Sequence, residues 1–330
     1  MKIGINGFGR IGRQALRIAF DDPGVEVVHV NDLAGAEQLA PLLQFDSTHG
    51  RFAHRVKPEG DSLHIDGKTV SVSAESDPAA LPWRDKGVDV VLESTGLFRK
   101  REQAKMHLDA GAGKVLVSAP GKSPLDGDFV IGVNDADYDP ARHHIVSIGS
   151  CTTNCLAPVA KVLHEEFGIE QGLINTVHAY TTSQNLLDGP HKDSRRARAA
   201  ADNLVPATTG AAEMIGRIIP DLDGRLSGLA VRAPVKCGSL LDLTCRVSRG
   251  ASAEQVNDAM MKWARGPMAG ILEVDEAPIV SSDVIGTEAS AIVSPGDTQV
   301  VDGRLVKVLA WYDNEWAFSR RCVDMMARLA

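Results

Sequence analysis

Residues 2–32 read KIGINGFGRIGRQALRIAFDDPGVEVVHVND, and this stretch decides the fold of the N-terminal part. The apolar residues of 2–6 predict a short buried strand, and apolar residues at helical spacing predict a helix over 13–20. An Asp-Asp-Pro-Gly turn at 21–24 leads into a second predicted strand over 25–30. Strand, glycine turn, helix and strand form the unit of a parallel, doubly wound sheet.

The glycine turn in this stretch has the form GxGxxG. Gly7 permits the tight turn, Gly9 lets a pyrophosphate approach the backbone, and Gly12 lets the helix pack closely on the strand. Asp32 ends the second strand, where a carboxylate can accept both hydroxyls of a ribose. We therefore predict a dinucleotide site, against the plainer alternative of a structural turn followed by a strand-end aspartate.

Further short strands in the N-terminal half extend the predicted sheet, at 88–93, 114–118, 129–133 and 145–148. The pattern changes near residues 148–151, which mark the expected domain boundary. The predicted elements beyond it are a helix over 152–167, strands over 172–180, 229–235, 239–247, 284–293 and 298–312, a helix over 252–265 and a last helix over 315–329. Ser252 and Gln255 form a capping box, and Asp302-Gly303 predicts a hairpin turn. The predicted fold class is α/β: a Rossmann-type doubly wound sheet followed by an α+β domain with a mixed or antiparallel sheet.

Composition narrows the functional classes. The chain has 330 residues, 44% hydrophobic and 24% charged, which is enough apolar material for a sizeable core. The formal net charge of −8 argues against a protein that grips nucleic acid or an anionic membrane. No apolar run approaches the length of a membrane helix, and five cysteines are too few for a disulfide scaffold. These features favour a cytoplasmic, reduced, globular α/β protein.

Two residues are candidates for nucleophilic chemistry. Cys151, in Ser-Cys-Thr-Thr-Asn-Cys at 150–155, opens a predicted helix whose dipole favours the thiolate, so we expect a lowered pKa. Cys155 lies one helical turn further on and is expected to be buried packing. His178 ends a β-rich run and needs only proximity to Cys151 to act as its base. The alternatives are an inert core cysteine and a structural histidine.

The basic cluster at 193–198 is expected to be a solvated or subunit-contact loop with ion pairs, a description that suits Arg196 best. Beside Thr181, the Thr-Thr-Gly of 208–210 and Arg232, however, it supplies hydroxyls and guanidiniums suited to phosphate oxygens. The histidines show no spacing typical of metal ligands, so no metal is expected.

Together these motifs resemble the phosphorylating glyceraldehyde-3-phosphate dehydrogenase family along the whole chain. The segments that carry the resemblance are IGINGFGRIGR at 3–13, VND at 30–32, FDSTHG at 45–50, SCTTNC at 150–155, HAYT at 178–181, TGAA at 209–212 and WYDNEW at 311–316. The resemblance implies NAD-dependent oxidation of glyceraldehyde 3-phosphate to 1,3-bisphosphoglycerate in glycolysis or gluconeogenesis. Cys151 would form a thiohemiacetal and then a thioester, with His178 as its ion-pair partner and base.

The resemblance also assigns binding residues. Those matching the two anion sites, for the substrate phosphate and inorganic phosphate, are Ser150, Thr152, Thr181, Arg195, Thr209, Gly210 and Arg232. Those matching dinucleotide contacts are Gly7, Gly9, Arg10, Ile11, Gly12, Asp32, Ser76, Ser118 and Asn314. It implies an NAD-binding domain of 1–149 with 315–330, and a catalytic domain of 150–314. The loop at about 181–206 would lie at a subunit interface of a homotetramer.

Some positions depart from the family pattern, and they leave alternatives open. The departures are Ser76, Ile148, Gly149, Lys236, Ala317 and Phe318. One alternative is oxidation of another aldose phosphate, such as erythrose 4-phosphate, with water completing turnover; another is a non-catalytic binding role. NAD is expected over NADP, because no arginine follows Asp32 to neutralise a ribose phosphate and Asp188 would add repulsion.

Overall fold

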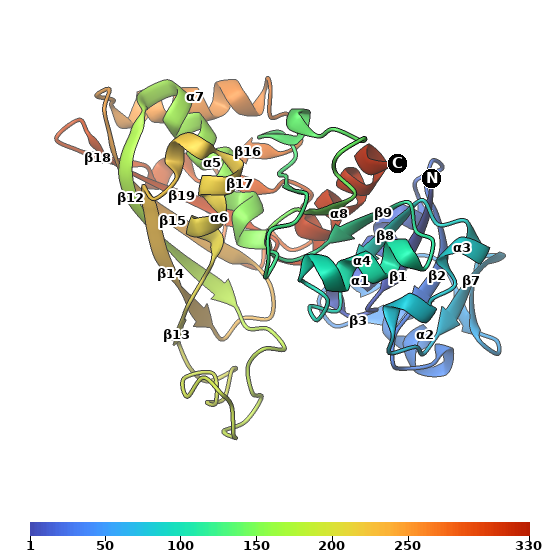
Figure 1. Ribbon diagram of the computed structural model, residues 1–330. Helices are drawn as coiled ribbons and strands as arrows, with labels where there is room; N and C mark the ends of the chain where they lie inside the picture. The colour runs from blue at the N-terminus through green and yellow to red at the C-terminus, as the bar shows by residue number, and fades with distance from the viewer. The chain divides into compact units, whose positions relative to one another are not determined.

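The computed structural model describes all residues 1–330, and the chain divides into two compact units (Figure 1). The first unit comprises Met1–Phe129, Asp137–Gly149 and Phe318–Ala330, and the second comprises Val130–Ala136 and Ser150–Ala317. The second unit therefore includes Val130–Ala136 and residues 315–317, which the resemblance places in the NAD-binding domain. None of the helices combines the length and apolar character that crossing a bilayer requires.

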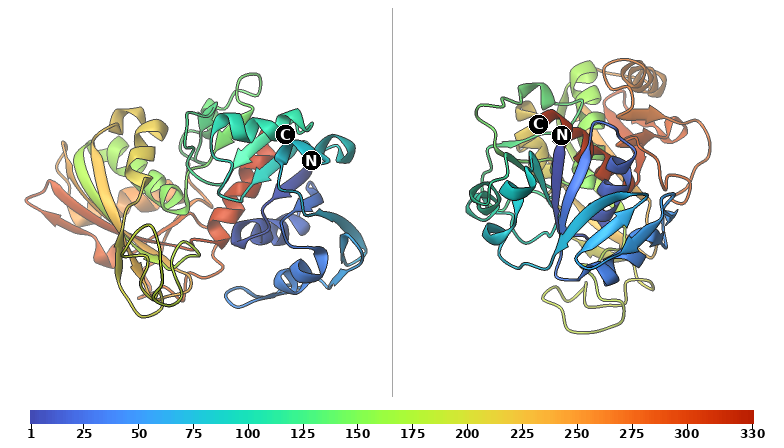
Figure 2. Two further views of the ribbon diagram at one scale, coloured as in Figure 1. Left: turned by 60° about the horizontal axis from the view of Figure 1, so that its bottom comes forward. Right: turned by 90° about the vertical axis from the view of Figure 1, so that its right-hand side faces the viewer.

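A nine-stranded sheet forms the centre of the first unit (Figure 2, right). In spatial order its strands are β10 (Gly127–Asp128), β11 (Ile145–Ser147), β9 (Lys114–Val117), β8 (Val90–Glu93), β1 (Lys2–Asn6), β2 (Glu26–Asn31), β7 (Lys68–Ser73), β6 (Ser62–Ile65) and β5 (Val56–Pro58). Pairing is parallel from β10 to β7, and β6 and β5 add antiparallel strands at one edge. The remaining elements are α1 (Arg10–Phe20), α2 (Ala36–Gln44), α3 (Trp83–Lys86), α4 (Arg101–Asp109), the pair β3 (Phe45–Asp46) and β4 (Gly50–Arg51), and most of α8 (Trp316–Leu329).

The strand order reverses direction at β1. The chain runs from β1 to β2 and β7 on one side, then returns to β8 and β9 on the other. Register places Asn6, the last residue of β1, opposite Asn31 of β2 and Glu93 of β8. Ligands of doubly wound sheets bind at the carboxyl ends of the strands beside such a reversal, so these three residues mark the expected crevice.

The second unit is built on an eight-stranded mixed sheet. In order its strands are β13 (Val205–Ala207), β14 (Leu226–Ala233), β12 (Ile169–Ala179), β15 (Ser239–Val247), β19 (Leu305–Tyr312), β17 (Ala291–Val293) and β16 (Leu272–Val274), with β18 (Gln299–Val301) pairing to β19. The helices α5 (Cys151–Phe167), α6 (Ala211–Ile218) and α7 (Ala253–Ala264) pack with the sheet around one core (Figure 1). Leu173 of β12 and Leu229 of β14 are exposed at 66% and 46%.

Most predicted elements are confirmed, and the misses have local causes. The capping box at Ser252 and the turn at Asp302 and Gly303, both with positive φ, are present. Residues 129–133 form a turn rather than a strand: the φ of +79° at Gly132 and a hydrogen bond from the Val130 amide to Asn134 Oδ1 fold the chain there. Of the strand predicted at 284–293 only the last three residues pair.

Candidate functional site

The glycine turn of the first unit has the geometry of a dinucleotide loop. Gly7 has φ +92°, and a Cβ there would lie 2.6 Å from the Thr95 amide nitrogen. A Cβ on Gly12 would clash with the Gly7 carbonyl oxygen, whereas one on Gly9 would meet nothing within 4 Å. The packing of the chain itself therefore requires glycine at positions 7 and 12. At Gly9 the space beside the backbone is free for a ligand.

The N-terminus of α1 is available to an anion. Its N-cap residue, Gly9, offers no side-chain hydrogen bond to the first N–H groups, which are left to a ligand. Asp32, half-buried after β2, faces the same loop: its Oδ2 accepts the Phe8 amide at 2.8 Å and its Oδ1 accepts the Ala34 amide at 3.2 Å. The residues present fit a bound NAD.

Arg10 and Ser118, two further expected cofactor residues, have partners within the first unit. The Arg10 guanidinium pairs with Asp46. Burial opposes the charge of Asp46, but hydrogen bonds from Arg10 and from backbone amides hold the pKa of its carboxyl well below the usual range. The Arg10 guanidinium is thus bound to another side chain of the protein. Ser118 Oγ donates to the Glu93 carbonyl oxygen at 3.1 Å, and Ser76 is exposed.

Cys151 and His178 come together in the second unit. Cys151 is the first residue of α5, and Ser150 caps this helix by accepting the Thr153 amide on its Oγ. Alternation along β12 buries Ile174 and His178 on one face of the sheet. The Sγ of Cys151 and the Nε2 of His178 lie 3.4 Å apart, within reach of proton transfer.

The protonation of the pair follows from burial and from Arg232. Burial raises the pKa of the Cys151 thiol and Arg232 partly offsets it, so the lowered pKa expected from the sequence is wrong for this group by itself. Burial, with help from Arg232, lowers the pKa of His178 to about 3, so the imidazole is a free base at neutral pH. Both shifts favour the neutral forms, so in this structure the thiol keeps its proton beside a neutral imidazole.

The backbone and Arg232 orient the imidazole. His178 Nδ1 lies 2.6 Å from the Ala179 carbonyl oxygen. In the tautomer with the proton on Nδ1, this nitrogen donates to that oxygen and the Nε2 lone pair faces the sulfur. Parallel pairing of β12 with β14 sets Arg232 opposite His178. Arg232 Nη1 lies 3.0 Å from the same carbonyl oxygen and 2.7 Å from Nδ1, and its buried Nε has no partner. That unsatisfied donor points to a missing anionic ligand.

Tyr312 is a site residue that sequence reasoning missed. Its hydroxyl bridges Thr152 Oγ1 at 2.8 Å and Thr176 Oγ1 at 2.7 Å, and its ring meets His178 edge-on at 6.1 Å between centroids. The side chain is buried, and it ties the start of α5 to β12. The Thr152 hydroxyl, expected at an anion, is instead held by Tyr312. The alternating pattern of β19 predicts burial of Tyr312 but not its partners.

The two neighbouring arginines of the basic loop differ in their surroundings. Arg195 is exposed, whereas the Arg196 side chain is 19% exposed and Nη1 of Arg196 donates to Ser183 Oγ, 2.9 Å from Thr181 Oγ1. Burial lowers the pKa of Arg232, and the nearby charge of Arg196 lowers it further. Arg196 also pairs with Asp193, and its charge is near enough to act on Arg232. The assignment of Arg195 to an anion site stays a prediction.

Thr209, Gly210 and Asn314 complete the expected set. Thr209 accepts the Ala211 amide at 3.3 Å at the start of α6, whose N-cap Gly210 gives no side-chain cap. Asn314 Oδ1 accepts the Gly238 amide and the Ser239 hydroxyl, which fixes the orientation of its amide.

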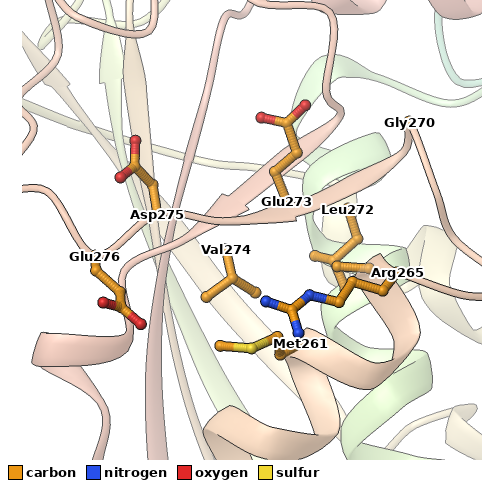
Figure 3. Close-up of a pocket in the computed structure, with 9 residues that line it drawn as sticks. Met261, Arg265, Gly270, Leu272, Glu273, Val274, Asp275 and Glu276 are labelled. Atoms are coloured by element: carbon orange, nitrogen blue, oxygen red, sulfur yellow. The ribbon is translucent and has the colours of Figure 1, made fainter.

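A separate cavity of about 410 Å³ lies between α7 and β16 (Figure 3). The Arg265 guanidinium lies beside Met261 and Val274 there, and the carboxylates of Glu273 and Glu276 stand at its rim. None of the predicted site residues lines this cavity.

We expect Cys151 to be alkylated before the other cysteines. It is partly exposed, whereas Cys155, Cys237, Cys245 and Cys322 are buried, and burial raises the pKa of Cys245 to about 12. The measurement is peptide mapping after limiting iodoacetamide at neutral pH. Uniform labelling, or labelling of Cys322 first, would contradict the assignment of Cys151 as nucleophile.

Known proteins share both parts of the chain. The family model "Glyceraldehyde 3-phosphate dehydrogenase, NAD binding domain" matches residues 1–101, and the corresponding C-terminal domain model matches residues 150–314. Glyceraldehyde-3-phosphate dehydrogenase of Geobacillus stearothermophilus is 51% identical over 330 residues, which cover 100% of this chain and 98% of that protein. The protein of the same name from Kitasatospora aureofaciens is 54% identical, covering 100% of this chain and 99% of its own.

Proposed function

The chain belongs to the glyceraldehyde-3-phosphate dehydrogenase family, and we propose that Cys151 and His178 carry out the family's reaction. The protein is an NAD-dependent oxidoreductase that acts on the aldehyde group of glyceraldehyde 3-phosphate. One observation carries the assignment of these two residues: the 3.4 Å contact between Sγ and Nε2 at the N-terminus of α5.

The first half of the reaction uses the pair as nucleophile and base. His178 Nε2 takes the thiol proton, and the Cys151 sulfur adds to the aldehyde carbon. The imidazolium returns the proton to the new alkoxide oxygen, which gives a thiohemiacetal and a neutral imidazole. Bound NAD supplies the hydride acceptor. As the hydride leaves, the hydroxyl proton passes to His178 Nε2, and the carbon becomes a thioester of Cys151.

The second half uses inorganic phosphate. A phosphate oxygen attacks the thioester carbon, the Cys151 sulfur leaves as thiolate, and 1,3-bisphosphoglycerate forms. We assign Arg232, Arg196 and Thr181 to phosphate groups of the two substrates, because they lie together beside the pair. The uncapped N-terminus of α6 at Thr209 and Gly210 offers further N–H donors to an anion.

A matched pair of arginine variants tests the anion sites. Arg196→Leu is expected to raise the KM for the aldehyde phosphate or for inorganic phosphate about ten- to a hundredfold, because a charge-assisted hydrogen bond is lost. Arg195→Leu, on the exposed neighbour, is the control and should change either KM by less than about threefold. The measurement is steady-state kinetics with each substrate varied. A larger effect of Arg195→Leu than of Arg196→Leu would support the assignment of Arg195 that the resemblance implies.

Cofactor choice is tested at Asp32. We expect at least a tenfold preference for NAD over NADP in kcat/KM, because the Asp32 carboxylate would repel a ribose phosphate and Leu33 offers no hydrogen bond. Asp32→Ala should shift the preference toward NADP. Asp188 pairs with Arg198 at 3.0 Å within its own loop, so its repulsion is reduced. Equal efficiencies in the unaltered protein would show that Asp32 does not contact the ribose.

We further propose a homotetramer that works in a reducing cytoplasm in glycolysis or gluconeogenesis. The helix-free face of the second unit's sheet exposes Leu173 and Leu229, which an identical subunit would cover. All five cysteines are unpaired, as thiols of a reducing compartment are.

Product analysis separates this function from the alternatives. The purified protein should convert glyceraldehyde 3-phosphate with NAD to an acyl phosphate, and only when inorganic phosphate is present. Faster turnover of erythrose 4-phosphate without phosphate would favour the other aldose. Absence of NADH formation with either aldehyde would favour a binding role.

A further inference from the structure

A buried carboxylate lies at the carboxyl end of β8, and the reaction described above gives it no task. The Glu93 side chain is 1% exposed. It lies in register with Asn6 of β1, which in turn pairs with Asn31 of β2. These strand ends form the floor of the crevice in which such a sheet binds its dinucleotide.

The direction of the hydrogen bonds on one side of Glu93 follows from two groups that can only donate, an indole N–H and a backbone amide. The indole Nε1 of Trp83 donates to His107 Nδ1 at 3.0 Å, so the proton of that neutral ring is on Nε2. His107 Nε2 then donates to Glu93 Oε2 at 2.9 Å. The backbone amide of Thr95 donates to Oε1 at 2.9 Å, and the Thr95 hydroxyl reaches the same oxygen.

A second series of hydrogen bonds starts at Asn31 of β2 and also ends with a donor to the Glu93 carboxylate. The Glu75 amide donates to Asn31 Oδ1 at 2.9 Å, so Nδ2 of Asn31 donates to Asn6 Oδ1 at 2.8 Å. Nδ2 of Asn6 must then donate to Glu93 Oε2, 2.6 Å away. All of these hydrogen bonds are donated to the Glu93 carboxylate oxygens. A carboxyl group that only accepts hydrogen bonds is in the environment of an ionised carboxylate. No lysine or arginine is among its hydrogen-bond or ion-pair partners.

The position of Glu93 in the sheet is on the side expected for the nicotinamide half of the cofactor. Asp32 at the end of β2 takes the adenosine ribose, so the nicotinamide half extends across β1 toward β8 and β9. Ser118, which follows β9, donates its amide to the Glu93 carbonyl oxygen at 3.0 Å. Glu93 therefore lies at the end of a strand on the side of the sheet toward which the nicotinamide half would extend.

We propose that the buried Glu93 carboxylate favours oxidised NAD over NADH, and so sets the ratio of their affinities. The proposal rests on NAD being the cofactor. The two forms share adenosine, riboses and pyrophosphate, but only the oxidised nicotinamide carries a positive charge. Unit charges about 10 Å apart in a protein of effective dielectric constant about 20 change a binding constant roughly tenfold. Because Glu93 is buried, added salt should weaken this effect little.

The test is Glu93→Gln, with dissociation constants for NAD and NADH measured by calorimetry in the absence of substrate. We expect NAD to bind about tenfold more weakly and NADH to change by about twofold or less. Trp83→Phe is the matched control: it removes the indole donor from the same network and leaves the charge, so the affinity ratio should stay within about twofold of the unaltered protein.

The ratio separates a charge effect from a merely structural one. Equal weakening of both forms in Glu93→Gln, or a shifted ratio in Trp83→Phe, would overturn the proposal. Should Glu93→Gln fail to fold, Glu93→Asp carries the test: it disturbs the same hydrogen bonds but keeps the charge. A retained ratio supports the proposal, and a tenfold shift overturns it. An unaltered protein that bound neither form would overturn the cofactor assignment itself, and this proposal with it.

Discussion

Replacement of Cys151 by serine is expected to reduce turnover with glyceraldehyde 3-phosphate at least about a thousandfold. A serine hydroxyl keeps the place at the N-terminus of α5, but His178 cannot ionise it at neutral pH as it can a thiol, because its intrinsic pKa is much higher. NADH formation in the steady state measures the loss. NAD affinity should be unchanged, because the dinucleotide loop belongs to the first unit.

Cys155→Ala is the matched control for this variant. Cys155 lies one helical turn further along α5 and is fully buried, so its truncation should cost stability and spare turnover. Turnover by the serine variant within tenfold of the unaltered protein would remove Cys151 from the mechanism. Turnover lost equally in both variants would indicate damage to α5 as a whole.

Replacement of His178 by asparagine should slow turnover by about a hundredfold or more, because no other base lies at the sulfur. Alkylation of Cys151 should also move to higher pH. Burial raises the pKa of this thiol, and without Nε2 to take the proton, the thiolate forms only as the pH approaches that raised value. In the unaltered protein the imidazole is neutral above about pH 3 and available throughout this range.

The pH profile of alkylation, read together with turnover, distinguishes the two tasks of His178. A shift in alkylation with unchanged turnover would mean that another group takes the proton during hydride transfer. Slow turnover with an unshifted alkylation profile would leave His178 as base but not as partner of the thiolate.

The sequence predicts the parts of this site better than their contacts. Glycine spacing and the strand-end Asp32 are local patterns with a fixed physical meaning, and the structure places them at one turn. The contact of Arg232 with His178 depends instead on the register of β14 against β12, which no local pattern specifies. The choice between Arg195 and Arg196 likewise depends on how an irregular loop turns, one residue at a time.

The effect of burial on the pKa of a side chain is the property that the sequence predicts least well. A cysteine at a helix N-terminus suggests a low pKa, but the desolvation that raises it depends on how tightly the unit packs. The same applies to Glu93: its place at the end of an apolar strand does not specify its exposure, and its burial and hydrogen-bond donors are seen only in the structure. Tyr312 was overlooked because its two threonine partners come from distant parts of the chain.

The packing of α5 bears on how activity is lost on denaturation. Leu156, Val159 and Leu163 of this helix are fully buried in the core of the second unit. Cys151 cannot leave His178 unless the helix leaves the sheet, which would expose that core. The nucleophile thus belongs to a helix packed in the core of the second unit rather than to a mobile loop. Rising denaturant should abolish thiol selectivity in the same step that releases the slowest-exchanging amides of α5, without an earlier, partly active state.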